Sequence, residues 1–127
     1  MIRTVRRARQ AHRKAIEQFY EDICTVYEYK SIKDEITKIT SKKEVAVLEG
    51  QPCKLSFESL DTANGSSNAA EKRISVKLFI SPDVAIKAGS KIVVTHMGEI
   101  TAYCSSGEPG KFATHQEIEL ELFERWA

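Results

Sequence analysis

The 127-residue sequence predicts a mainly β fold, a small antiparallel β-barrel or sandwich with one N-terminal α-helix. After residue 22, apolar side chains recur at every second position in short runs, which is the period of a half-buried strand. Turn residues interrupt these runs every 8–12 residues or so, a spacing typical of small all-β domains. Before residue 23 the apolar spacing is helical. We therefore expect a basic helix in residues 1–22 and one β-barrel domain in residues 23–127.

The expected helix covers residues 3–21, where no Gly or Pro interrupts helix-favouring side chains. It is strongly basic, and no acid occurs among the first 14 residues. Arginines near the start of a helix oppose its dipole, so this end needs a packing partner or an anionic one. Either the segment is an arm that grips phosphate or an acidic protein face, or its charges form a solvated surface. The six basic residues are Arg3, Arg6, Arg7, Arg9, Arg13 and Lys14.

Alternating apolar positions then predict successive strands separated by Gly, Pro and Asp. Residues 32–41 are polar and indicate a hairpin connection or a weak, exposed strand. The run Gly50-Gln51-Pro52 predicts a turn, as do Ser81-Pro82-Asp83 and Ala88-Gly89-Ser90, while Met97-Gly98-Glu99 predicts a tight hairpin. The strands are expected at residues 23–29, 44–48, 53–59, 74–80, 91–96, 100–104 and 116–123.

Residues 61–73 predict a long flexible loop, because small polar side chains bury too little surface to offset the entropy of ordering. Loops of this length are often functional.

Side chains with catalytic or metal-binding chemistry are scattered along the chain. His12, His96 and His115 lie far apart, and the sequence lacks the GxGxxG, P-loop, HExxH and GxSxG motifs. We expect His96 to be a solvated turn residue. The three cysteines, Cys24, Cys53 and Cys104, lie outside any CxxC motif and are expected to be reduced. These features predict no enzyme, no metal, no cofactor and, without a long apolar run, neither a secretory signal nor a membrane partner.

The last expected strand carries Glu117, Glu119 and Glu121 on one face, opposite Ile118 and Leu120. Such a row of acids is either a solvated face or a surface that accepts the basic arm of a neighbouring copy. Trp126 follows this strand, and it either anchors an interface, where Trp is enriched, or closes the protein's own core.

Four phrases of the sequence resemble small neck proteins from the head–tail module of tailed phages and prophages of Gram-positive bacteria. Together they span most of residues 24–126, and the family is marked by strand pattern and phrases rather than by a catalytic motif. The phrases are Cys24-Thr-Val-Tyr27, Gln51-Pro-Cys-Lys-Leu-Ser-Phe57, Lys77-Leu-Phe-Ile-Ser-Pro-Asp83 with Gly89-Ser-Lys-Ile92, and Thr114-His-Gln-Glu-Ile-Glu-Leu-Glu-Leu-Phe-Glu-Arg-Trp126.

The resemblance implies a head-completion or head-closure ("stopper") connector, a ring homo-oligomer of six or twelve copies around the DNA channel. Its implied partners are the portal or adaptor protein, the tail-terminator or tail-tube protein, and packaged double-stranded DNA. It would be assembled in the bacterial host cytoplasm and reside at the neck of the virion. Residues 61–73 best match the channel loop of such proteins, although they contain no bulky residue that would plug a channel. The candidate loop residues are Asp61, Asn64, Gly65, Ser66, Ser67, Asn68, Lys72 and Arg73.

Two other functions fit the same sequence. A tail-terminator or another tail-associated structural protein has a similar size and β content. A small nucleic-acid-binding β-barrel would use the basic helix and the tyrosines Tyr20, Tyr27 and Tyr29 to hold phosphates and stack on bases.

Overall fold

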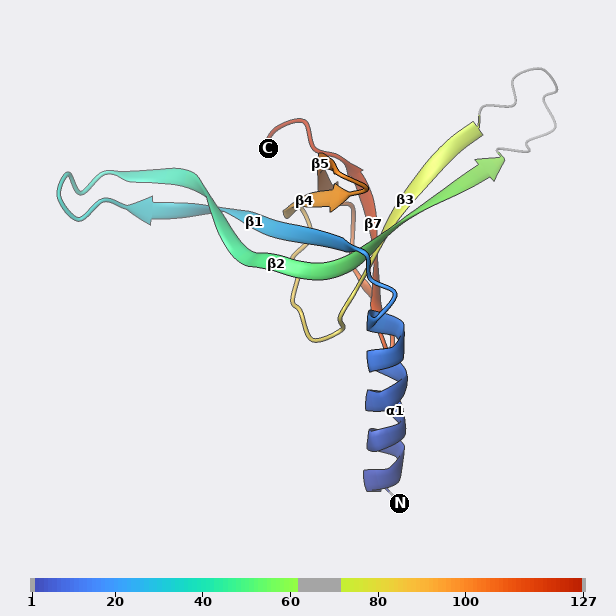
Figure 1. Cartoon of the computed structure of the whole chain (residues 1–127). Helices are drawn as coiled ribbons and strands as arrows, with labels where there is room; N and C mark the ends of the chain where they lie inside the picture. Colours follow the sequence, from blue (N-terminus) through green and yellow to red (C-terminus); the bar gives the residue numbers. More distant parts are fainter. Residues whose placement is uncertain (1, 62–71, 127) are drawn as a thin grey trace.

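The computed structural model describes residues 2–61 and 72–126 (Figure 1). Within these residues one helix, α1 (Ile2–Glu17), precedes seven strands. The strands are β1 (Asp22–Lys33), β2 (Thr40–Asp61), β3 (Lys72–Ile80), β4 (Lys91–His96), β5 (Glu99–Ser105), β6 (Gly110–Lys111) and β7 (Gln116–Leu122). The expected mainly β fold with an N-terminal helix is therefore confirmed.

All strand pairings in this sheet are antiparallel, and most follow chain order. The order is β3-β2-β1-β4-β5-β7-β6, and β3 also pairs with β7. That additional pairing closes a cycle through β1, β2, β3, β7, β5 and β4, so the central part of the sheet has no free edge. Closure of this kind protects backbone hydrogen-bonding groups that an edge strand would expose.

The core forms where alternate residues of the closed strands point inward. Leu78 and Ile80 of β3, Ile92 of β4 and Ile118 of β7 are almost completely buried. The tight hairpin between β4 and β5 has positive φ angles at Met97 (49°) and Gly98 (80°), the combination that a two-residue type I′ turn requires. The expected hairpin at Met97-Gly98-Glu99 is thus confirmed.

The expected turn at Gly50-Gln51-Pro52 is wrong, because β2 runs through it without a break. The register against β1 slips on both sides of Val26, so β2 accommodates extra residues there as bulges. Gly50 supplies a φ of 59°, which suits a bulge. The Leu55 N–H faces Asp22 of β1, so two-residue alternation turns the nitrogen of Pro52 to the other side. On that side of β2 the neighbouring strand is β3, whose last residue pairs with Cys53. Pro52 lies beyond this pair, so its missing N–H removes no hydrogen bond to β3.

Three segments project from the closed sheet in different directions (Figure 1). Helix α1 leaves at one end. The hairpin formed by Tyr29–Lys33 and Thr40–Glu44, here called the β1–β2 arm, extends past the strands that flank it. Its tip is a turn in which Asp34 Oδ1 accepts the Ile36 N–H at 2.9 Å, and this hydrogen bond lowers the pKa of Asp34. The third projection is the far part of the β2–β3 pair.

The expected loop 61–73 is shorter than its predicted bounds. Asp61 pairs with Lys72, and Leu60 pairs with Arg73, so these backbone positions belong to β2 and β3. Backbone pairing between β2 and β3 extends to these four residues, and no alternation of apolar side chains in the sequence indicated it. The other candidate loop residues, Asn64, Gly65, Ser66, Ser67 and Asn68, lie outside the described residues.

Candidate assembly surfaces

Helix α1 is anchored to the sheet through its last turn. Arg13 donates to Asp83 Oδ2 at 2.6 Å, to the Ser81 hydroxyl, and to Glu17 Oε1 at 3.1 Å. The hydrogen bond to Asp83 raises the pKa of Arg13 and, in return, holds the pKa of Asp83 below its ordinary value. The buried Gln116 amide donates to the Ser81 and Val84 carbonyls at 2.8 and 2.6 Å, which fixes the loop that receives Arg13. One residue of the expected phosphate-binding arm is therefore committed to its own chain.

The first three turns of α1 have no support from the described part of the protein. Every residue from Thr4 to His12 is exposed, and Val5 retains 49% of its accessible surface. Val5, Ala8 and His12 share one stripe by their three- and four-residue spacing, while Arg7, Gln10 and Lys14 lie opposite. A helix of this length is marginal without tertiary packing. The basic arm predicted from the sequence is thus an amphipathic helix with an uncovered face.

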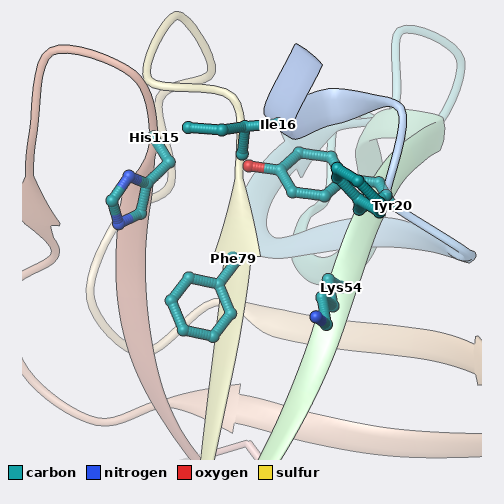
Figure 2. A pocket seen from close by; sticks show the side chains of 6 residues that line it. Ile16, Tyr20, Lys54, Phe79 and His115 are labelled. Carbon is teal, nitrogen blue, oxygen red and sulfur yellow. The ribbon is translucent and has the colours of Figure 1, made fainter. Parts of the chain in front are cut away.

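An apolar hollow lies where the end of α1 meets the sheet (Figure 2). Ile16, Phe19 and Tyr20 line it from the helix end, and Lys54, Phe79 and His115 line it from β2, β3 and the approach to β7. The Tyr20 hydroxyl is buried without a hydrogen-bond partner in the described structure, and burial raises its pKa. The His115 ring stacks on Phe112 with centroids 4.9 Å apart, so His115 serves in side-chain packing.

Strand β7 presents the acidic row that the sequence predicted. Glu119 and Glu121 are exposed and alternate with buried Ile118 and Leu120. Glu117 is partly covered and lies 3.3 Å from the His115 ring, so it belongs to that local cluster. The exposed end of the row therefore consists of Glu119 and Glu121.

A groove opens beside this acidic end because two strand pairings stop at different points. β3 pairs with β7 only as far as Val76 and Leu120, whereas β2 and β3 stay paired to Asp61 and Lys72. Beyond Val76 the two-stranded ribbon separates from β7 and uncovers its inward-facing side. The groove is lined by Phe57, Ile74, Val76, Tyr103, Cys104, Leu120, Glu121, Leu122, Glu124 and Arg125.

Three apolar side chains of this groove are exposed although the alternation of their strands places them on the inward face. Phe57 is 52% exposed, and Ile74 and Leu122 are each 68% exposed. Each side chain points to the inward side of its strand. It is nevertheless exposed, because the strands on the other side of the core do not extend far enough to cover it. Such a cluster of uncovered apolar side chains is typical of a protein-interaction surface.

The β1–β2 arm is a basic projection that was not predicted from the sequence. Residues 30–43 contain five lysines and two acids, and all of them are exposed. Lys30 lies directly opposite Lys43, a cross-strand pairing of like charges that opposes strand association. Five lysines in 14 residues could have signalled this surface. The lysines are Lys30, Lys33, Lys38, Lys42 and Lys43.

Trp126 packs on its own chain at the base of this arm. Its ring stacks on Tyr29 with centroids 5.1 Å apart and meets Phe123 edge-on at the same distance. The indole N–H donates to Glu44 Oε1 at 3.3 Å, and Lys91 contacts the same oxygen at 2.7 Å. Trp126 therefore packs within its own chain, as one of the two alternatives held. It stabilises the base of the β1–β2 arm and does not fill the core.

His96 is not a solvated turn residue, because it binds a buried carboxylate. Its Nδ1 lies 2.8 Å from Asp22 Oδ1, and the Asp22 side chain is only 4% exposed. The second oxygen of Asp22 accepts the buried Leu55 N–H at 2.8 Å. This pair ties the first residue of β1 to the last residue of β4 and to β2. It is a structural linkage across three strands.

The thiols and acids show no metal-binding arrangement within residues 2–61 and 72–126, where no group of three potential ligands occurs. Cys24 and Cys53 are buried, and a hydrogen bond that the Cys53 thiol donates to Cys24, together with burial, raises the pKa of Cys53. Burial also raises the pKa of the partly exposed Cys104. In the same part of the chain, no helix has the length and apolar character needed to cross a membrane.

Comparison with solved structures finds a similarity of fold. No protein-family model matches the chain, and no curated protein matches it. The fold is similar to that of the phage-like element PBSX protein xkdH from Bacillus subtilis, with 11% sequence identity and a TM-score of 0.49. The matched region covers 79% of this chain and 91% of the other.

Proposed function

We propose that this protein is a structural component of a tailed-phage or prophage particle and serves as a head–tail connector at the neck. In this function it joins the portal or adaptor side of the capsid to the tail, forms a ring around the DNA channel and helps to retain DNA. The proposal starts from the four phrases that resemble phage neck proteins. It adds a physical observation, which is that the closed sheet carries three projections whose exposed side chains lack cover from the described chain.

The uncovered projections are the observation that carries this proposal. Helix α1 exposes its first three turns, the β1–β2 arm ends in the exposed Ile36 and Ile39, and the β2–β3 ribbon exposes Ile74. Ile36 retains 93% of its accessible surface at the tip of the arm. Exposed apolar groups on projecting elements favour contacts with other subunits. A connector needs several such contacts at once, with copies of itself, with the layer above and with the layer below.

The β1–β2 arm is the described element best suited to face DNA in such a ring. Its five lysines outnumber its two acids within residues 30–43, and an extended hairpin can reach away from the subunit body. Lysines that neutralise phosphates release counterions, which makes DNA binding fall steeply with salt. We propose that this arm, rather than a compact binding site, supplies the contact with packaged DNA.

Deletion of the gene from an inducible phage or prophage tests the proposed function. A neck connector is required for joining, so the expected result is DNA-filled heads and complete tails that remain separate. A plasmid copy of the wild-type gene should restore joined particles that contain the protein by mass spectrometry. Normal particles without the protein would refute the proposal, and tails of uncontrolled length would favour the tail-terminator alternative.

A further inference from the structure

We infer that copies of this protein associate head to tail, with the exposed half of α1 from one copy seated in the groove between the β2–β3 ribbon and β7 of the next. This inference rests on the proposed self-assembly and assigns it a surface. Each chain carries both surfaces of the proposed interface, the exposed part of α1 and the groove. Neither surface is covered by the described part of its own chain, so each needs a second copy.

The donor half is the basic amphipathic helix. Its stripe of Val5, Ala8 and His12 is exposed, and the small Ala8 allows close approach to a neighbouring surface. Arg6 and Arg9 lie on one flank of this stripe by helical spacing, and Arg7 lies on the opposite face of the helix. A basic helix whose stripe carries the apolar Val5 and Ala8 fits an apolar groove with an acidic rim, a recurring mode of helix recognition.

The acceptor half is the groove lined by Phe57, Ile74 and Leu122. Glu121 and Glu124 lie on its margin, and Glu119 continues the exposed acidic row on β7. Arg125 also lines the groove and offsets one of these charges. The net negative charge of the margin therefore depends on Glu119, Glu121 and Glu124 together. Apolar contacts would seat the helix, and the acidic row would select its basic flank.

The two halves lie at different ends of the molecule (Figure 1). Helix α1 leaves one end of the sheet, and the ribbon that forms the groove extends from another. Arg13 holds α1 to the loop at Asp83, so the helix is kept away from the groove of its own chain. An interface made from two different patches is heterologous, and repetition produces a ring when the rotation closes.

A mixing experiment with full-length variants tests this arrangement. One variant blocks the groove with Ile74→Asp and Leu122→Asp, two positions that are 68% exposed and tolerant of a polar side chain. The other reverses the charged flank of the helix with Arg6→Glu and Arg9→Glu, both at exposed positions. Each variant alone should lose self-association by about 100-fold or more, because each keeps only one working half.

Light scattering of an equimolar mixture should give a discrete heterodimer, since each variant supplies the half that the other lacks. Adding Glu121→Arg and Glu124→Arg to the variant with the reversed flank should restore its self-association. Failure of the mixture to associate, when the wild type assembles, overturns the inference. So does a wild-type chain that remains monomeric at its highest soluble concentration.

Crosslinking through the native Cys104 gives a second, independent readout, because this thiol lines the groove while Cys24 and Cys53 are buried. Val5→Cys with a short bis-maleimide should produce interchain products that disappear when Cys104→Ser is added. Gln10→Cys, on the opposite side of the helix, is the matched control and should react much less. Equal crosslinking from both positions, or none from Val5→Cys, overturns the inference. The proposed neck function fails separately, if joined particles form without the protein.

Discussion

Replacing Asp22 should destabilise the closed sheet more than any exposed substitution in β1. The carboxylate is only 4% exposed and has two partners, the Leu55 N–H and the His96 ring, each 2.8 Å away. Asp22→Ala removes both hydrogen bonds and leaves the Leu55 N–H buried without a partner. An orphaned buried donor costs about 1–3 kcal/mol, and hydrogen bonds to charged groups contribute about 1.5–3 kcal/mol each. Allowing for partial relaxation, we expect a loss of about 3 kcal/mol in the free energy of unfolding.

Urea unfolding followed by far-ultraviolet circular dichroism measures this loss. With a slope of about 2 kcal/mol per molar urea, the midpoint should fall by about 1.5 M. Asp22→Asn is the matched control, because its amide oxygen still accepts the Leu55 N–H, and it should lose less than half as much. A midpoint for Asp22→Ala within about 0.3 M of the wild-type value would refute the assigned role of this carboxylate.

Three further results are expected from other parts of the structure. Trp126→Ala removes two aromatic contacts of about 1 kcal/mol each. Amide hydrogen exchange in the β1–β2 arm should therefore accelerate, while exchange in β4 stays slow. Equal protection of the arm in Trp126→Ala and in the wild type would contradict the stabilising role of Trp126. Leu78→Ala leaves a cavity in the core and should cost about 2–5 kcal/mol, measured by thermal or urea unfolding; a cost under about 1 kcal/mol would show that Leu78 is not core. Arg13 lowers the pKa of Asp83, so the stabilisation from this pair is present above the ordinary aspartate pKa of about 3.9 and is lost as pH falls through the lower folded value. In an acid titration followed by nuclear magnetic resonance, α1 should therefore detach in that range, and Asp83→Asn should remove this pH dependence; an unchanged titration would contradict it.

The sequence predicted the β elements well because alternation is a local property. The strand at residues 91–96, the hairpin at Met97 and Gly98, and the last strand from Gln116 all agree with the structure. The Gly50-Gln51-Pro52 run shows the limit of local signals, because the same residues serve a turn or a bulge. The choice between them depends on which strand lies beside Pro52, and that contact is long-range.

The assembly surfaces could be predicted only in part, for a related reason. Alternation places Phe57, Ile74 and Leu122 on the inward faces of their strands, but it does not show where the covering strands end. The linkage of Asp22 and His96 joins residues 74 apart in sequence, and no local pattern reports such a pair. The basic helix was visible from composition, since six charges without an acid are a local feature.

An electron-microscopy reconstruction of the intact particle would show directly where this chain lies and which copies touch. We expect a ring of identical copies of this chain at the junction of head and tail, encircling the DNA, with α1 of each copy against β7 of its neighbour. Density for this protein elsewhere in the particle, or as single copies without mutual contact at the neck, would contradict the claim.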